Sequence, residues 1–326
     1  MNSTYCVLCD TCSRLRKAKV EDFGDKRLKM EKHQLKETPE ITVGVSTFNR
    51  KDYLRESLES LQNQTFHDFE IIVVDDGSTD GTREMIRRDF PGIRYLYQEN
   101  QGDAAAKNKV AAHARGRYLV FNDSDDLFLP DALERLYAPL VNDPDGCSYG
   151  QYITIDSAGN RLPTKNKMKI FPSGNILPDL ILHIIVHSCA TLMPLKLFRQ
   201  IGGHDITLLC GHDYKLALEL AVRTGFHAIE KPVFLRRRHS TNLSSTNYEK
   251  MSLILKVLNE FLEKYPDVRG KYGAAIRKRF AALHGKLARE AKKELLPRTT
   301  VRRHLKAALH ETFSLKSLCR YVISFF

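Results

Sequence analysis

Three aspartates follow a short apolar run near the middle of the chain, and this stretch constrains the fold more than any other. Residues 117–122 read Arg-Tyr-Leu-Val-Phe-Asn, and Asp123, Asp125 and Asp126 come directly after them. An aromatic and branched apolar run that stops at a polar cluster predicts a buried strand arriving at a turn. Asp123 and Asp125 are two residues apart, so in an extended segment both would face one side and share a hard divalent cation. A solvated Asp-rich turn is the alternative.

Two earlier stretches repeat this pattern of an apolar strand that stops at polar residues. Residues 41–47 lead into Asn49 and Arg50, and residues 69–74 lead into Asp75 and Asp76. Strands that alternate with helices of 10–15 residues predict an α/β fold with a doubly wound, mostly parallel sheet. Ligands bind at the carboxyl ends of such strands, so we expect all three polar patches to lie along one edge.

The rest of the chain continues the pattern and then becomes helical. We expect a polar leader at 1–39, the α/β domain at 40–245 and a helical basic region at 246–326. The further elements that we expect are a strand at 93–97, a helix from Asp103 that Gly116 stops, a helix at 131–141, strands at 148–155 and 186–193, a helix opened by Gly211, a strand at 226–235, and helices from 248 to the end.

The C-terminal region carries the excess positive charge of the chain. The net charge is +12, and residues 264–320 hold 16 Lys and Arg against 4 Asp and Glu. Ile276, Phe280, Leu283 and Leu287 form an apolar stripe beside these basic residues. A basic amphipathic helix is typical of peripheral attachment to an anionic membrane surface. A helical subdomain that packs on the rest of the protein is the alternative.

The N-terminal region shows no secretion signal, and no apolar run approaches the roughly 18 residues that cross a bilayer. We therefore expect a cytoplasmic protein with reduced thiols, peripheral at most on the inner face of the cytoplasmic membrane. Cys6, Cys9 and Cys12 are evenly spaced, and they either help to hold a metal or are free thiols. A basic nucleic-acid-binding protein is a further reading, but acidic strand ends would repel phosphate and no recognised binding motif accompanies the charge.

Taken in order, the motifs at roughly 40–245 resemble those of the family 2 glycosyltransferases, which have a GT-A type fold. The motifs that carry the resemblance are Val45-Ser46-Thr47-Phe48-Asn49-Arg50, Val74-Asp75-Asp76-Gly77-Ser78-Thr79-Asp80-Gly81-Thr82, Asn100-Gln101-Gly102 with Lys107-Asn108, Asp123-Ser124-Asp125-Asp126, His212-Asp213 and Arg238-His239.

The resemblance implies an inverting enzyme that moves a sugar from a nucleotide-sugar, usually a UDP-sugar, to an acceptor hydroxyl. It implies Mn²⁺ or Mg²⁺ held by Asp125, Asp123 and His239, and Asp213 as the base that deprotonates the acceptor. An ordinary N-cap role for Asp213 is the alternative. The donor-binding positions that it implies are Thr47, Asn49, Arg50, Asp76, Lys107, Asn108, Asp123 and Arg238, with Asp76 accepting the uracil N3–H.

The chain departs from the family pattern at two of these positions. His212 stands where many relatives have Glu, and Lys107 stands where they usually have Arg. His204 and Asp205 lie in the stretch that commonly faces the acceptor. The resemblance implies a glycan or lipid-linked acceptor in surface polysaccharide assembly, and we expect no nucleic acid. A non-catalytic sugar-nucleotide-binding protein on the same fold is the alternative, although a degenerate site would be expected to lose Asp125 or Asp213.

Overall fold

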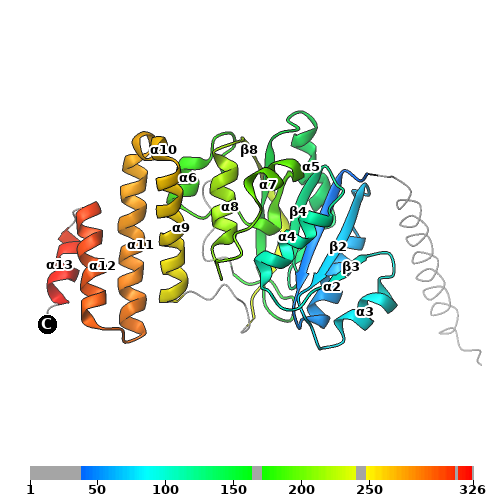
Figure 1. The fold of residues 1–326 in the computed structure, drawn as a ribbon, viewed down its shortest axis with the longest axis horizontal. Helices are drawn as coiled ribbons and strands as arrows, with labels where there is room; N and C mark the ends of the chain where they lie inside the picture. The colour runs from blue at the N-terminus through cyan, green and yellow to red at the C-terminus, as the bar shows by residue number, and fades with distance from the viewer. Residues whose placement is uncertain (1–37, 164–170, 240–246, 313–314, 325–326) are drawn as a thin grey trace, which may run out of the picture.

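The protein is an eight-stranded sheet with helices on both faces, followed by a stack of C-terminal helices (Figure 1). The structure is a computed structural model, and it describes residues 38–163, 171–239, 247–312 and 315–324. The predicted leader, with Cys6, Cys9 and Cys12, lies almost entirely outside these residues.

The strands are β1 (Ile41–Thr47), β2 (Phe69–Asp75), β3 (Arg94–Tyr97), β4 (Tyr118–Asp123), β5 (Leu127–Phe128), β6 (Cys147–Ile155), β7 (Thr191–Pro194) and β8 (Phe226–Arg237). The helices of the α/β part are α2 (Lys51–Gln62), α3 (Thr82–Asp89), α4 (Asp103–His113), α5 (Ala132–Tyr137), α6 (Leu177–Leu182), α7 (Leu195–Ile201) and α8 (His212–Ala221). The C-terminal helices are α9 (Tyr248–Lys264), α10 (Pro266–Lys271), α11 (Gly273–Lys293), α12 (Arg298–Glu311) and α13 (Leu315–Ile323).

The sheet is mostly parallel, as the sequence predicts. Its strand order is β3-β2-β1-β4-β7-β6-β8-β5, and β3, β2, β1 and β4 run parallel to one another, whereas β7 pairs antiparallel with both β4 and β6. Thr47 lies opposite Asp75, and Ser46 lies opposite Asp123. The ends of β1, β2 and β4 therefore lie along one edge, which confirms the expected placement of the three polar patches.

Alternate side chains of the strands point to two hydrophobic cores. Val43 and Val45 of β1 pack in a cluster with residues of α2, α3 and α5, whereas Ile72 and Val74 of β2 pack in a cluster with residues of α4, α7 and α8. A β-carbon at Gly44 would lie 2.4 Å from a methyl group of Val110, so the glycine lets α4 pack close to β1. This packing places the start of α4 at the functional edge of the sheet.

Two of the expected elements differ from the structure, and one strand of the structure was not expected. Residues 188–190 form a 3₁₀ turn, so β7 begins only at Thr191. The helix expected at 131–141 ends at Tyr137 and continues as a 3₁₀ turn through Val141, because Pro139 has no N–H to donate. The two-residue strand β5, which pairs antiparallel with β8, was not expected at all.

The apolar stripe of α11 is buried inside the protein. Ile276, Phe280, Leu283 and Leu287 are at most 6% exposed, and α11 packs against α6, α9 and α12. The stripe therefore packs on other helices, and the idea that it lies in a membrane interface is wrong. Among the helices of the described residues, none combines the length and the apolar character needed to cross a bilayer.

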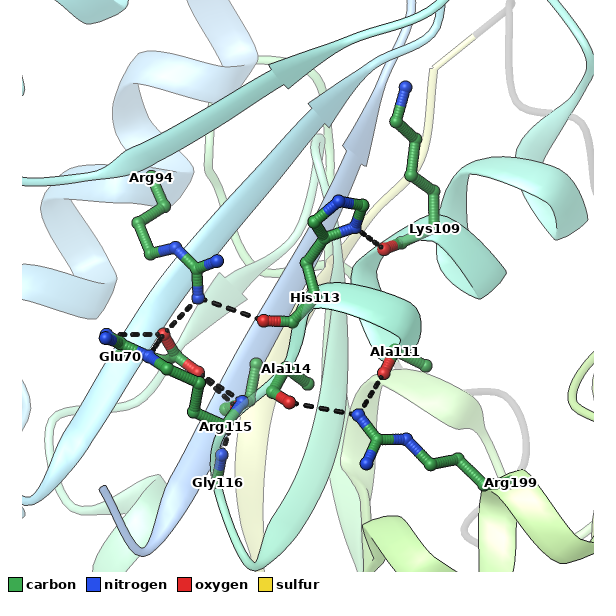
Figure 2. Close-up of polar contacts among 10 residues, drawn as sticks. Glu70, Arg94, Lys109, Ala111, His113, Ala114, Arg115, Gly116 and Arg199 are labelled. Atoms are coloured by element: carbon green, nitrogen blue, oxygen red, sulfur yellow. Dashed lines mark hydrogen bonds and ion pairs between the residues drawn. The ribbon is translucent and has the colours of Figure 1, made fainter. Parts of the chain in front are cut away.

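Arginine side chains form a hydrogen-bond network at the amino ends of the parallel strands, at the end of the sheet away from the three polar patches (Figure 2). The carboxylate of Glu70, at the start of β2, accepts hydrogen bonds from the Arg94 side chain at 2.7 Å and from the Arg115 backbone N–H at 2.7 Å. Arg199 of α7 donates to the carbonyls of Ala111 and Ala114 at 2.8 and 3.0 Å. The last carbonyls of α4 are thereby satisfied, and the helix is anchored at the end away from the functional edge.

Candidate active site

The aspartates at the end of β4 lead into a turn, with Asp123 as the last residue of the strand and Asp125 and Asp126 after it. The N–H of Asp126 donates to the carbonyl of Asp123 at 3.0 Å, so the segment is not extended. The expectation that Asp123 and Asp125 extend side by side is therefore wrong. Asp123 contacts Lys107 at 3.2 Å, whereas Asp125 contacts Arg50 and His239. In this turn the carboxylates of Asp123 and Asp125 therefore contact different side chains.

Asp125 lies between a guanidinium and an imidazole. Arg50 Nη1 is 2.8 Å and His239 Nε2 is 2.7 Å from Asp125 Oδ2. The ring of Tyr53 stacks on His239 with a centroid distance of 5.0 Å. The structure thus brings together Asp125 and His239, which the sequence names as metal ligands 114 positions apart.

Arg237, which sequence reasoning missed, holds this turn from β8. Its backbone N–H donates to Asp126 Oδ1 at 2.9 Å, and its Nε donates to the Asp125 carbonyl at 3.1 Å. Its Nη2 lies 2.5 Å from Glu56 Oε2. The arginine is only 2% exposed. In the sequence it lies among other arginines, and nothing there distinguishes it from them.

Lys107 is a buried cation among three carboxylates. Its Nζ lies 2.8 Å from Asp103, 3.2 Å from Asp123 and 3.8 Å from Asp213. Burial alone would lower the pKa of Lys107, but the three carboxylates raise it well above its usual value. Asp103, a residue that sequence reasoning did not single out, also accepts from Ser46 Oγ at 2.5 Å and lies 3.2 Å from His212 Nε2.

Asp213 lies in the first turn of α8 and does not cap it. The N-cap is Gly211, whose φ of 85° suits a residue without a side chain, so the N-cap alternative is wrong. The Asp213 side chain is 40% exposed. Burial would raise its pKa, but Lys107, His212 and His204 hold the pKa at about 2. The carboxylate is therefore ionised at neutral pH.

Asp76 and Asn49 organise the loops beside the end of β2. The carboxylate of Asp76 accepts from the Gln98 side chain at 2.7 Å and from the N–H groups of Gln101 and Gly102 at 2.9 and 2.8 Å. Asn49 adopts a φ of 51° and accepts from the N–H of Thr79 at 2.8 Å. The donor-base contacts expected of Asp76 and Asn49 stay predictions.

Thr47, Asn108 and Arg238, which the resemblance also implies in donor binding, differ in their exposure and in their hydrogen bonds. Thr47 is 3% exposed, and its hydroxyl has no hydrogen-bond partner within the described chain. The amide of Asn108 donates to the His204 carbonyl and accepts from the His204 N–H, both at 2.8 Å, so it fixes the backbone there. Arg238 follows β8 with an exposed side chain. Asp75 accepts from the N–H of Ser78 at 2.8 Å and so caps the turn that follows β2.

Comparisons with known proteins identify the family. The model of the family described as "Glycosyl transferase family 2" matches residues 42–202. An uncharacterized glycosyltransferase of Rickettsia conorii is 30% identical over 69% of this chain, and a chondroitin synthase of Escherichia coli is 28% identical over 79%. The chain spans only 39% and 38% of the lengths of these two relatives.

Solved structures share the fold. S. aureus TarS 1–349 in complex with UDP-GlcNAc has a TM-score of 0.58 and 18% identity, covering 88% of this chain and 89% of that one. A mannosyltransferase from Pyrobaculum calidifontis in complex with GDP-Man and Mn²⁺ has a TM-score of 0.59 and 20% identity, covering 93% and 88%. At this identity the likeness shows a GT-A fold and no more. Together with the matched sequence at 42–202, it shows that the chain belongs to glycosyl transferase family 2.

Proposed function

We propose that this protein transfers a sugar, with inversion, from a UDP-sugar to an acceptor hydroxyl. The observation that carries the proposal is the arrangement around Lys107, whose ammonium contacts both Asp123 at the end of β4 and Asp213 at the start of α8. Asp123, which we assign to donor binding, and Asp213, which we assign to deprotonation of the acceptor, therefore belong to one charged cluster.

In this reaction Asp213 accepts the proton of the acceptor hydroxyl. The hydroxyl oxygen forms a bond to C1 of the sugar, while the bond from C1 to the diphosphate oxygen breaks and the nucleoside diphosphate leaves with the electron pair. Attack from the face opposite the leaving group inverts the configuration at C1. A positioned general base accelerates such a step by about 10²–10⁴-fold. Lys107 supports this role because it keeps Asp213 ionised.

The residues around Asp125 suit a divalent cation. Oxygen ligands match Mn²⁺ and Mg²⁺, and the guanidinium of Arg50 beside Asp125 shows that positive charge is stable at this carboxylate. Asp125, with Asp123 and His239, would hold the ion, which supplies positive charge against the leaving diphosphate. Arg50 and Arg238 would bind phosphate oxygens of the donor.

We further propose an acceptor on a glycan or a lipid-linked glycan, in assembly of a surface polysaccharide or glycoconjugate. The chondroitin synthase relative supports a glycan acceptor, and the UDP-GlcNAc and GDP-Man complexes support a nucleotide-sugar donor. Exposed basic side chains of α11 and α12, among them Lys278, Lys292 and Lys306, support attachment to an anionic membrane surface through charge.

A panel of UDP-sugars with Mn²⁺, scored for donor binding, UDP release and transfer, tests the proposal. We expect Asp125→Asn to lose metal-dependent donor binding, and Asp213→Asn to keep donor binding but lose transfer by about 10²–10⁴-fold. Asp143→Asn is the matched control, because this carboxylate pairs with His227 away from the site. Full activity in either site variant would refute the assignment. UDP binding without transfer from any donor would favour the non-catalytic alternative.

A further inference from the structure

Two histidines beside Asp213 are buried with unsatisfied polar atoms. The His204 residue is 3% exposed and His212 is 7% exposed. Within the described chain, neither ring nitrogen of His204 has a hydrogen-bond partner, and neither do His212 Nδ1 and Asp213 Oδ1. Buried polar atoms without partners are rare in folded proteins, and they commonly mark the place of a water molecule or an ion.

The ligand atoms of this cluster have the spacing that one metal ion requires. His204 Nδ1 lies 3.8 Å and His212 Nε2 lies 3.6 Å from Asp213 Oδ1. One ligand atom from each of the three residues lies within 4.8 Å of the others. Tetrahedral Zn²⁺, with bonds of about 2.0–2.1 Å, keeps its ligand atoms roughly 3.3 Å apart. Small rotations of the side chains would close the difference.

The fold holds the three side chains on well-anchored backbone. Asn108 of α4 bonds both the N–H and the carbonyl of His204. The His204 ring packs against Phe121 and Phe198, with centroid distances of 5.4 and 5.5 Å. His212 and Asp213 are consecutive residues of the first turn of α8. The cluster is therefore built into the core and does not depend on a surface loop.

The charge around the cluster also favours a dication. Lys107 is one ammonium among the three carboxylates of Asp103, Asp123 and Asp213, which leaves two negative charges without a compensating cation in that group. The side chains of these carboxylates are 28–43% exposed, so water compensates their charge only in part. Two imidazoles with a carboxylate form a ligand set that suits Zn²⁺.

We propose that His204, His212 and Asp213 form a Zn²⁺ site, separate from the Asp125 site for Mn²⁺ or Mg²⁺. Binding of Zn²⁺ to the Asp213 carboxylate draws negative charge toward the ion, so Asp213 becomes a weaker acceptor of the proton and the ion inhibits transfer. The binding claim stands on the geometry alone, whereas the inhibition rests on the proposed function.

Binding is tested with Co²⁺, which takes Zn²⁺ sites and absorbs visible light more strongly in tetrahedral than in octahedral coordination. The titration uses the full chain with Cys6, Cys9 and Cys12 replaced by Ser, because thiolates would compete for the ion. We expect one equivalent of Co²⁺ with a tetrahedral spectrum. His204→Gln and His212→Gln should each weaken binding at least 10-fold, and circular dichroism reports whether each variant is folded.

Matched controls separate this site from other ligands. Asp125→Asn should keep the tetrahedral spectrum, as should His227→Gln, which removes a histidine paired with Asp143 on another part of the surface. An unchanged spectrum in a folded His204→Gln or His212→Gln variant would refute the site. A spectrum that is octahedral and disappears with Asp125→Asn would also refute it.

The inhibition is measured separately, at saturating Mn²⁺, as the Zn²⁺ concentration that halves transfer by each protein relative to its own rate without Zn²⁺. We expect this concentration to rise at least 10-fold in His204→Gln, and added Mn²⁺ not to relieve the inhibition. Relief by Mn²⁺ would refute the inhibitory role and assign the effect to the Asp125 site. Tetrahedral binding in a protein without transferase activity would refute the proposed function and leave the Zn²⁺ site intact.

Discussion

The ammonium of Lys107, a residue of α4, lies 3.8 Å from the carboxylate of Asp213. The same ammonium contacts Asp103 and Asp123, so a single buried cation compensates side chains from the starts of two helices and the end of a strand. Its removal would leave three carboxylates, whose side chains are 28–43% exposed, to repel one another.

We therefore predict that Lys107→Met destabilises the protein and alters the pH dependence of transfer. Breaking a fully buried ion pair costs about 3–5 kcal/mol in the free energy of unfolding, and the cost should be smaller here because water reaches the three carboxylates. Without the ammonium the pKa of Asp213 rises from about 2, so the acidic limb of kcat/KM moves to higher pH. Lys107→Arg keeps the charge and should leave the limb near its original position. A Lys107→Met enzyme with an unmoved limb would contradict the role of Lys107.

Glu70 offers a stability test away from the active site (Figure 2). Burial would raise its pKa, but hydrogen bonds from Arg115, Arg94 and Thr42 lower it below 4.5. Because the folded-state pKa is depressed, its contribution is complete above the unfolded pKa and is lost as pH falls through the folded pKa. We expect Glu70→Gln to cost about 1–3 kcal/mol at pH 7 in urea denaturation, with a smaller difference in acid.

The surface pair of Glu290 and Lys293 is the control for that measurement. Lys293 is 69% exposed, so Glu290→Gln should change the free energy of unfolding by no more than about 1 kcal/mol. Equal effects of the two substitutions would show that burial of the Glu70 network adds nothing to its stability.

Gly202 and Gly203 form a matched pair for testing the Asn108 contact. Both have positive φ, at 91° and 75°, where an L-residue costs roughly 1–2 kcal/mol. A β-carbon at Gly202 meets open space, whereas one at Gly203 would lie 2.5 Å from Asn108 Oδ1. We expect Gly203→Ala to be more destabilising than Gly202→Ala, and to weaken transfer because it displaces His204. Identical urea midpoints would mean that the Asn108 contact is dispensable.

His304 makes the C-terminal helices sensitive to acid. Its Nε2 lies 2.9 Å from the Tyr248 hydroxyl and its Nδ1 lies 3.0 Å from His284 Nδ1. Burial, with His284 and Arg303, lowers the pKa of His304 to about 4 from 6.5. The unfolded chain therefore takes up this proton more readily, and stability should fall as pH drops from 6.5 toward 4.

The thermal midpoint of the full chain, followed between pH 7 and pH 4, measures this effect. His304→Phe should reduce the loss, whereas His310→Phe, at an exposed position of α12, should leave it unchanged. A pH dependence that is the same in both variants would contradict the assignment to His304.

The sequence predicts the functional edge of the sheet well, because that edge follows from local patterns. Each strand that ends there is an apolar run closed by polar residues, and parallel pairing then forces Thr47, Asp75 and Asp123 into neighbouring positions. The start of α8 at His212 is likewise marked locally, by Gly211. The strand β5 has only two residues, which is too short for any periodicity to show.

The contacts between the residues of the candidate site could not be predicted from local sequence patterns. Asp103 looks like an ordinary first-turn acid until α4 and α8 are packed together, and Asn108 is a polar residue on a helix until His204 reaches it. Their roles depend on contacts between residues about 100 positions apart, on which the local sequence carries no information. For the same reason the sequence could not show whether the apolar stripe that contains Ile276 packs on other helices or faces a membrane.

The contact of Arg237 with the aspartate turn has a consequence for how the protein is made. Arg237 is the final residue of the last strand, and its side chain reaches Glu56, 181 positions earlier. A chain still emerging from the ribosome can pair β1 to β4 long before residue 237 has been synthesised. The turn that carries Asp125 and Asp126 therefore lacks the hydrogen bonds of Arg237 until β8 joins the sheet, so a nascent chain can complete its parallel strands before it completes this turn.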